Sequence, residues 1–266
     1  GEIRNYGDTV QVRTFGNVTV QDYSRGTPIA SESLVPVKES LTINSAKYFA
    51  FEVDDLDKAQ NDINAIDGYT QRAGVALSNN VDSFIFAAAS SAHASNIVSN
   101  GGSAIDITPN TATTAMYELA VSAGLALDNF DVPTDQRWLV VSPYAKSILV
   151  KSTSYFIRAT EMGDAVVATA RLGMGAREAM GRGYIGQMAG FDVWVSTNLA
   201  GTSTGKYCMY GQGKPISYAA QIPVGTVEAL RLEGTFATRV RGLLLHGKAV
   251  FTEDSKRLGY IYADLS

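Results

Sequence analysis

The sequence has few of the residues that carry chemistry in enzymes and metal centres. Its 266 residues include one cysteine, Cys208, and two histidines, His93 and His246. A single cysteine excludes an intrachain disulfide, and three ligands this far apart do not indicate a zinc site or a catalytic triad. We expect Cys208 to be a small buried apolar residue. We expect each histidine to be a polar surface residue or a core residue with satisfied hydrogen bonds.

Charge is also scarce. Charged residues make up 18% of the chain, and the formal net charge is −4. Specific nucleic-acid binders normally carry a basic stripe. The loosest basic cluster here consists of Arg231, Arg239, Arg241 and Lys248. It lies on strand-like sequence with acids nearby, so we interpret it as solvated strand edges. The low charge suggests that other molecules cover much of the surface, and no apolar run is long enough to span a membrane.

The first fifty residues predict a long β-arm. Residues 10–12 and 18–20 alternate valine with polar residues, and the Gly16-Asn17 pair between them predicts a two-residue hairpin turn. Residues 24–40 have no period and predict a loop. Alternation then returns in a stretch whose apolar residues share one parity: Leu41, Ile43, Phe49, Phe51 and Val53. A ribbon of this kind is marginal in water unless it packs on something else.

At Asp54 the apolar period changes from two residues to three or four, which predicts a helix reaching about Ala92. If unbroken, this helix is roughly 55 Å long, and Gly68 and Gly74 are the points where it would kink. Its first turn contains three acids, Asp54, Asp55 and Asp57. They favour helix capping over a cation site, because the spaced oxygen ligands and the glycine of a calcium loop are missing.

The rest of the chain mixes helices and strands. We expect a helix at 113–127, a strand at 138–141, a short helix with Pro143 in its first position, mixed helix and loop at 163–180, a helical turn at 215–222, and strands at 227–233, 236–251 and 258–265. This order lacks the regular alternation of strand and helix that marks a parallel sheet. It predicts an α+β fold without internal repeats.

One stretch, GRGYIG, matches the glycine spacing of a dinucleotide-binding loop at Gly181, Gly183 and Gly186. Such a loop needs a strand before it, a helix after it and an acid about 20 positions further on. Here a helix-like stretch precedes the glycines, an alternating strand follows them, and residues 201–207 contain no acid. We therefore predict a hairpin over 184–196, with glycines at its entry and turn. A dinucleotide-binding enzyme is the alternative that rests on this stretch alone.

Without a motif for catalysis, a cofactor or a metal, we assign no residue to such a site and predict that the protein is not an enzyme. A projecting β-arm and an over-long helix indicate instead a chain that contacts copies of itself or a partner. Ordering an extended arm costs conformational entropy unless a neighbour receives it.

Four stretches, taken in order along the chain, carry a family resemblance. They are GDTVQVRTFGNVTVQDYSRG with LTINSAKYFAFEVDDLDKAQ, RWLVVSP, GYIGQMAGFDVWVSTNL, and FATRVRGLLLHGKAVF. Together they resemble the major capsid proteins of tailed bacteriophages with the Hong Kong 97-like fold. The first looks like the family's extended loop (E-loop) running into its spine helix, the second like a central strand–helix pair, the third like a glycine-marked hairpin, and the fourth like a late pair of strands.

The resemblance implies a division of the chain. Residues 1–6 would be the remnant of an N-terminal arm, 7–53 the E-loop, 54–103 the spine helix and peripheral domain, 104–225 mainly the axial domain, and 226–266 the return strands of the peripheral domain. Some relatives form lysine–asparagine crosslinks, for which Lys38 is a conceivable donor. No partner asparagine or catalytic glutamate can be matched, so an ordinary surface lysine is favoured.

The same resemblance implies a function. Copies would assemble as pentamers and hexamers into an icosahedral head that encloses phage double-stranded DNA without sequence-specific binding. The chain would belong to the virion, assembled in the host bacterial cytoplasm. Its partners would be itself and possible scaffolding, portal and decoration proteins, with no membrane contact. An encapsulin-like compartment shell with the same fold is the alternative.

Overall fold

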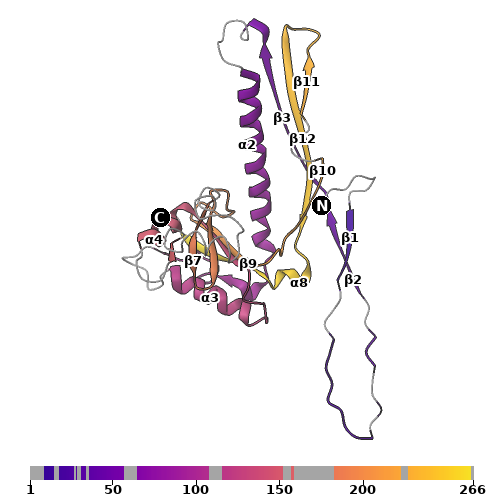
Figure 1. The fold of residues 1–266 in the computed structure, drawn as a ribbon, viewed down its shortest axis with the longest axis vertical. Helices are drawn as coiled ribbons and strands as arrows, with labels where there is room; N and C mark the ends of the chain where they lie inside the picture. Colours follow the sequence, from indigo (N-terminus) through magenta and orange to yellow (C-terminus); the bar gives the residue numbers. More distant parts are fainter. Residues whose placement is uncertain are drawn as a thin grey trace, which may run out of the picture.

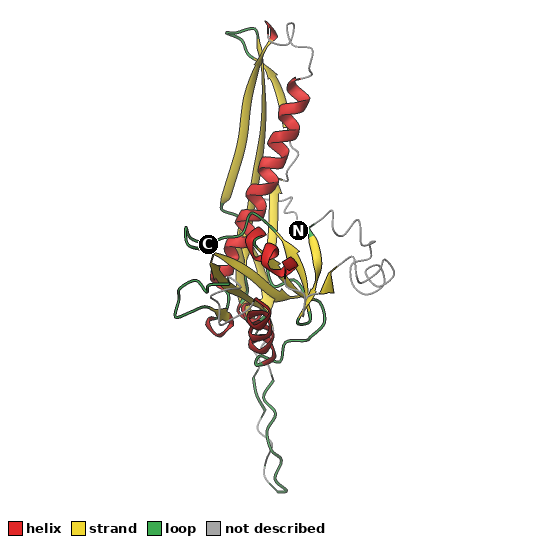
Figure 2. Cartoon of the chain, turned by 90° about the vertical axis from the view of Figure 1, so that its left-hand side faces the viewer, coloured by secondary structure: helices red, strands yellow, loops and turns green. Residues whose placement is uncertain are grey.

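The computed structural model of the chain describes residues 9–14, 18–26, 28, 31–33, 36–56, 65–107, 116–151, 157–158, 183–222 and 227–264. They form an elongated unit of long strands beside a long helix, a rounder unit around a seven-stranded sheet, and a thin ribbon that projects past both (Figure 1). Seen from the side, the long helix still runs along the long strands (Figure 2). Separate helices combined with mainly antiparallel sheets confirm the predicted α+β class.

The elongated unit is organised around one long strand, β12 (Ala237–Ala249), which has partners on both sides. β3 (Ser45–Asp54) pairs along one edge of β12. β11 (Val227–Arg231) and β10 (Ser217–Ile222) share its other edge, and all three partners are antiparallel to it. β12 therefore carries the backbone hydrogen bonds that hold this four-stranded sheet together.

Two predictions for this region are wrong. The resemblance to a late pair of strands at 236–251 fails because β12 is a single strand. Its glycines are not turn residues: Gly242 lies against the Phe49 ring, and Gly247 lies against the backbone of the chain entering β3. The helical turn expected at 215–222 is instead the strand β10, because pairing with β12 outweighs the weak local helix signal.

The long helix is α2 (Ala65–Phe86), followed by the 3-10 helix η1 (Ala87–Ser91). The rings of Phe51 in β3 and Tyr69 in α2 have centroids 5.8 Å apart. The odd-numbered residues of β3 around Phe51 therefore face the helix and the even-numbered ones face away.

Most of the helix prediction is confirmed. The helical stretch ends at Ser91, with Ala92 as its C-cap residue, and runs through Gly68 and Gly74 without interruption. Leu77 and Ala88 of the predicted apolar stripe are buried. The predicted start at Asp54 is wrong, because Asp54 is the last residue of β3, and residues 57–64 lie outside the described residues.

The rounder unit is built on a seven-stranded sheet in the order β4-β13-β9-β5-β8-β7-β6. Its strands are β4 (Ile97–Val98), β5 (Arg137–Val141), β6 (Ile157–Arg158), β7 (Tyr184–Met188), β8 (Phe191–Val195), β9 (Gly205–Gln212) and β13 (Leu258–Asp264). The β4–β13 and β5–β8 pairs are parallel and the other pairs are antiparallel. The strand predicted at 138–141 is thus the centre of a mixed sheet.

Two helices accompany this sheet. α3 (Met116–Asp128) buries the residues that the sequence places on one side, Met116, Leu119, Ala120, Ala123 and Leu127. α4 (Pro143–Lys151) begins at Pro143 as predicted. Ser142 precedes it and accepts a hydrogen bond from the backbone N–H of Ala145 at 3.2 Å, as an N-cap residue does. The helix and loop expected at 163–180 lie outside the described residues.

The GRGYIG stretch leads into the predicted hairpin. β7 and β8 are antiparallel and joined by Ala189 and Gly190, whose φ angles of 49° and 82° fit a tight hairpin turn. Gly186, with φ 150°, lies where the strand register shifts. A strand, not a helix, follows the glycines, so no helix N-terminus is present to receive a pyrophosphate. Gly181 lies outside the described residues.

The ribbon differs from the predicted arm. β1 (Thr9–Thr14) pairs with β2 (Val37–Thr42), ending at the Thr14–Val37 pair. The hairpin between 10–12 and 18–20 is therefore wrong: the partner of β1 comes from the far end of the stretch expected to be a loop, and residues 18–24 form no strand. Pairing a few residues across Gly16-Asn17 cannot compete with a six-residue ladder.

The two sheets also mix distant parts of the chain. β13 pairs with β9 in the seven-stranded sheet, although it follows β12 of the long sheet in sequence. β10 pairs with β12, although it follows β9. Boundaries at 103 and 226 therefore do not coincide with the sheets, and the division into domains stays a prediction.

Candidate assembly surfaces

The residues with potential chemistry are dispersed and structural. Cys208 is fully buried in β9, and burial raises the pKa of its thiol to about 11, so it is not a reactive thiolate. His93 is half-buried, accepts a hydrogen bond from the Ser95 backbone N–H at 3.2 Å, and meets the Phe130 ring edge-on. His246 is fully buried on β12 with hydrogen bonds to neighbouring side chains. All three expectations are confirmed.

The described residues offer no ligand set for an ion. Across the described ranges, no three His, Cys, Asp or Glu side chains gather closely enough to hold a metal ion. Asp54 accepts a hydrogen bond from the Leu56 backbone N–H at 2.8 Å, and Asp55 is paired with Arg231. Within the same ranges, no helix has the length and apolarity needed to cross a membrane.

Three members of the basic cluster, Arg231, Arg239 and Arg241, are solvent-accessible and paired with carboxylates, so the predicted solvated character is confirmed for them. The predicted edge position is wrong for the residues of β12, which is a central strand, and Lys248 is half-buried over the Phe84 ring. Arg239 donates through Nε to Glu52 at 2.8 Å, and Arg241 donates to Glu228 at 2.9 and 3.0 Å. The pKa of Arg231 is raised by its hydrogen bond to Asp55. With their charge already shared with carboxylates, these arginines do not form a phosphate-binding stripe.

The first candidate surface is the arm, residues 18–33 where described, which continues the β1–β2 ribbon away from both units (Figure 1). Val18, Val20 and Tyr23 are exposed there, Val20 to 94%. Within the described part of the arm, Thr19 donates its backbone N–H to Glu32 across the loop at 3.1 Å. Apolar side chains held this far from the chain's own core are suited to a contact with another molecule.

The base of the arm is fixed to the body through β2. Leu41 and Ile43 are buried with Ala219 and Phe251, which joins the ribbon to the long sheet. Glu39 accepts hydrogen bonds from both the backbone N–H (3.0 Å) and the hydroxyl of Thr252. Thr252 begins the short helix α8 (Thr252–Ser255), so a single carboxylate ties the ribbon to the connection between the two sheets.

We expect Glu39→Ala to loosen this attachment. It removes two hydrogen bonds to a carboxylate and should lower the free energy of unfolding by about 1–2 kcal/mol. Amides in 37–42 should exchange hydrogen faster than in the unaltered protein, measured by mass spectrometry. Lys38→Ala, at the exposed neighbouring position, is the control and should change neither quantity. Equal exchange in both variants would show that Glu39 does not hold the ribbon.

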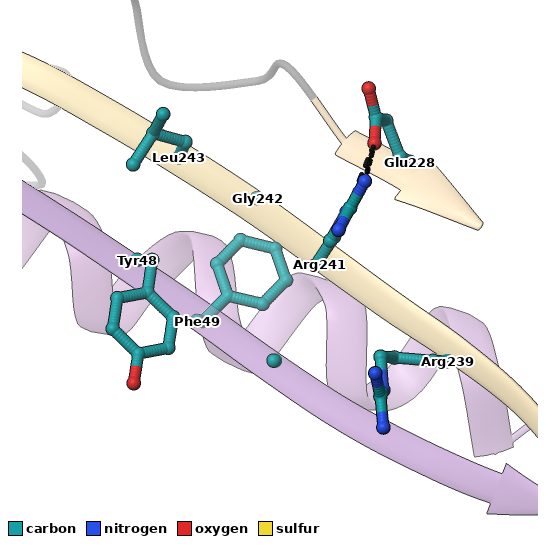
Figure 3. A pocket seen from close by; sticks show the side chains of 8 residues that line it. Tyr48, Phe49, Glu228, Arg239, Arg241, Gly242 and Leu243 are labelled. Carbon is teal, nitrogen blue, oxygen red and sulfur yellow. Dashed lines mark hydrogen bonds and ion pairs between the residues drawn. The ribbon is translucent and has the colours of Figure 1, made fainter. Parts of the chain in front are cut away.

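The second candidate surface is the face of the long sheet that points away from α2, which we call the outer face. The strand register places Tyr48 opposite Leu243, and Ala50 opposite Arg241. Glu228 of β11 lies opposite Arg241 on the other side. Figure 3 shows these side chains with α2 behind the strands.

This outer face combines apolar and charged groups. Tyr48 is 78% exposed and Leu243 43% exposed. The Arg241–Glu228 ion pair lies next to them along the strands, and the Arg239–Glu52 pair follows beyond it. A shallow hollow of about 590 Å³ lies here, lined by Tyr48, Phe49, Ala50, Glu228, Arg239, Arg241, Gly242 and Leu243. The residues that line the hollow are both apolar and charged, and none of them is a nucleophile beside an activating base. The hollow is suited to a protein contact and not to catalysis.

The sequence did not single out either the outer face or Glu39. Strand periodicity places Tyr48 on one face of β3 and Leu243 on one face of β12, so the sequence indicates which residues share a face with each of them. Which face of the sheet is covered depends on where α2 packs, and this is not readable from strand periodicity. Glu39 and Thr252 are separated by 213 positions, and nothing local connects them.

Comparisons with known proteins identify the family and the fold. A family model described as phage capsid protein matches residues 38–254. A comparison with curated protein sequences finds no match. Among solved structures, a chain of Mycobacterium phage Che8 is similar, with 25% identity and a TM-score of 0.67 over 96% of this chain and 84% of that one.

Two further structures show the same fold at lower identity. The capsid of Ralstonia phage GP4 has 13% identity and a TM-score of 0.69, covering 98% of this chain and 84% of that one. The capsid of cyanophage P-SCSP1u has 16% identity and a TM-score of 0.66, covering 100% and 86%.

The fold is therefore that of a tailed-phage shell subunit, of the Hong Kong 97-like class. The chain belongs to the phage capsid protein family. It is a structural, non-enzymatic major capsid protein that self-assembles into the capsid shell of the virion. The interpretation of GRGYIG as a dinucleotide site is wrong, because Gly183 and Gly186 lie at the start of a hairpin of a shell subunit.

Proposed function

We propose that copies of this chain assemble as pentamers and hexamers into an icosahedral head that encloses phage double-stranded DNA. The observation that carries this proposal is the arm, which projects away from the chain's own cores and exposes Val18, Val20 and Tyr23. When the same head-to-tail contact is repeated around a closed ring, every copy has both of its contact surfaces covered by a neighbour. Each arm then gains a receptor on the next copy, which compensates for the entropy of ordering it.

The arm corresponds to the E-loop at 7–53, which in this proposal lies over a neighbouring copy. The outer face has suitable chemistry to receive it, because Tyr48 and Leu243 offer exposed apolar area there. The spine helix would be α2 with η1, in a peripheral domain with the long sheet. The seven-stranded sheet would form the axial domain, and β13 would join it, in contrast to a boundary at 226.

The DNA would be enclosed without sequence-specific binding. The net charge of −4 and the arginines paired with carboxylates favour a container that does not grip phosphates. Scaffolding, portal and decoration proteins are the further partners proposed, with assembly in the host bacterial cytoplasm. A shell whose inner face is densely basic would contradict this description of the DNA contact.

The purified 266-residue chain should form rings and closed shells, visible by negative-stain microscopy and as large particles by light scattering. Five-fold and six-fold capsomers on one particle are the expected result. Shells isolated from infected cells should contain double-stranded DNA; shells filled with a protein cargo would instead support a compartment function. A monomer or dimer at every concentration and salt would overturn the proposal.

A further inference from the structure

The deepest polar group of the elongated unit is His246, near the end of β12. Its side chain is fully buried where β3, β10, β12 and α2 meet. The imidazole stacks on the Phe84 ring of α2 with centroids 4.4 Å apart, and the Tyr218 ring of β10 meets its edge at 5.7 Å. Four elements therefore pack around one titratable ring.

Both ring nitrogens of His246 have a hydrogen-bond partner. Nδ1 lies 3.1 Å from the Tyr218 hydroxyl, and Nε2 lies 3.1 Å from the Ser45 hydroxyl at the start of β3. A neutral imidazole has one donor and one acceptor, and a hydroxyl can take either role. The neutral ring is thus fully satisfied in either tautomer and connects β3 to β10 through β12.

The surroundings oppose a positive charge on this ring. The charged groups that act on it are Lys47 of β3 and Lys248 of β12, and both disfavour protonation. Lys248 already lies over the same Phe84 ring at 4.6 Å and donates a hydrogen bond to the Phe84 carbonyl oxygen. Among the described contacts, Tyr218 is the titratable group on β10, α2 presents only the Phe84 ring, and no carboxylate faces the imidazole.

The packing of β3, β10, β12 and α2 around His246, which we call the joint, lies where the ribbon leaves the long sheet. Ser45 comes three residues after the end of β2, and the next residue of β12, Gly247, lies against the backbone of Thr42 and Ile43. We propose that His246 is a pH-sensitive lock: its neutral ring fastens β3, β10 and β12 to the end of α2 beside the point where the ribbon enters the long sheet, and its protonation in mild acid loosens this packing.

The direction of the effect follows from linkage. Burial, and then the two lysines, lower the pKa of His246 below its ordinary value of about 6.5. The unfolded chain therefore takes up a proton at a higher pH than the folded chain. The stabilisation is complete above pH about 6.5 and is lost as the pH falls from there towards the folded-state pKa, by at most about tenfold in the unfolding equilibrium per pH unit.

The test uses the fact that the chain has only two histidines. The unaltered protein, His246→Gln and the control His93→Gln are unfolded with urea at pH 7.5, 6.5 and 5.5. In the unaltered protein and in His93→Gln, the free energy of unfolding should fall below pH 6.5 with the same slope against pH. His246→Gln should be weaker at pH 7.5 but lose less stability on acidification. The proposal would be overturned if the free energy of unfolding of His246→Gln kept the same dependence on pH, or if that dependence disappeared in His93→Gln.

A second measurement does not depend on the folding of His246→Gln. In His93→Gln with isotope-labelled histidine, the single ring signal belongs to His246 and can be titrated directly. It should stay neutral through pH 6.5, and amides of 37–47 and 217–220 should exchange faster at pH 5.5, after correction for the intrinsic rate. A ring that titrates at about 6.5, with no change in exchange, contradicts the proposal.

Discussion

Replacing residues 15–36 with an Asn-Gly turn is expected to abolish shell formation while leaving the subunit folded. Thr14 and Val37 are the last pair of the β1–β2 ladder, so a two-residue turn can close the ribbon directly. The replacement removes Val18, Val20 and Tyr23, whose burial on a neighbour is worth about 5 kcal/mol per copy. That is more than a thousandfold in the association constant of each contact. Negative-stain microscopy and sedimentation measure the loss.

The matched comparison keeps the length of the arm. Val18→Ser/Val20→Ser/Tyr23→Ser should reproduce most of the defect, whereas Ser24→Ala/Ser31→Ala/Ser33→Ala changes three exposed polar residues of the same arm and should assemble normally. Circular dichroism and urea unfolding should agree among all variants. Closed shells formed by the hairpin replacement at normal yield would show that the arm is not the assembly contact.

Local periodicity predicted the elements that are defined by residues close together in the sequence. The buried side of α3, the first turn of α4 and the β7–β8 hairpin each follow from spacing within about a dozen residues. In each case the apolar pattern and the turn or cap residues indicate the same structure. The helical stretch ending at Ser91 belongs to this group, because its apolar stripe continues to the last turn.

The failures all concern pairing across sequence distance. The Gly16-Asn17 signal is local, but β1 pairs with a strand that starts 23 positions after β1 ends, and six paired residues outweigh one turn. β10 has a weak helical pattern that an exposed edge of β12 overrides. The outer face shows the same limit for function. Tyr48 is exposed only because α2 covers the opposite side of β3.

The joint around β12 also explains why a small residue is required next to His246. A methyl group on Gly247 would lie 2.2 Å from the Thr42 carbonyl oxygen and 2.8 Å from the Ile43 Cα atom. Both are backbone atoms, so no side chain can rotate to make room. The neighbouring strand would have to move, and with it the point where the ribbon enters the long sheet.

Gly247→Ala is therefore expected to lower the free energy of unfolding by about 3 kcal/mol, at the upper end for overpacking in a well-packed site. Urea unfolding at pH 7.5 measures this, and faster hydrogen exchange in 37–47 would locate the displaced ribbon. Gly234→Ala is the control: its added methyl group meets no atom within 4 Å, and the change should stay within about 0.5 kcal/mol. Because the clash is steric, Gly247→Ala should lose the same amount at pH 7.5 and pH 5.5. A loss confined to low pH would mean that the glycine acts through His246 and not through the backbone of Thr42 and Ile43.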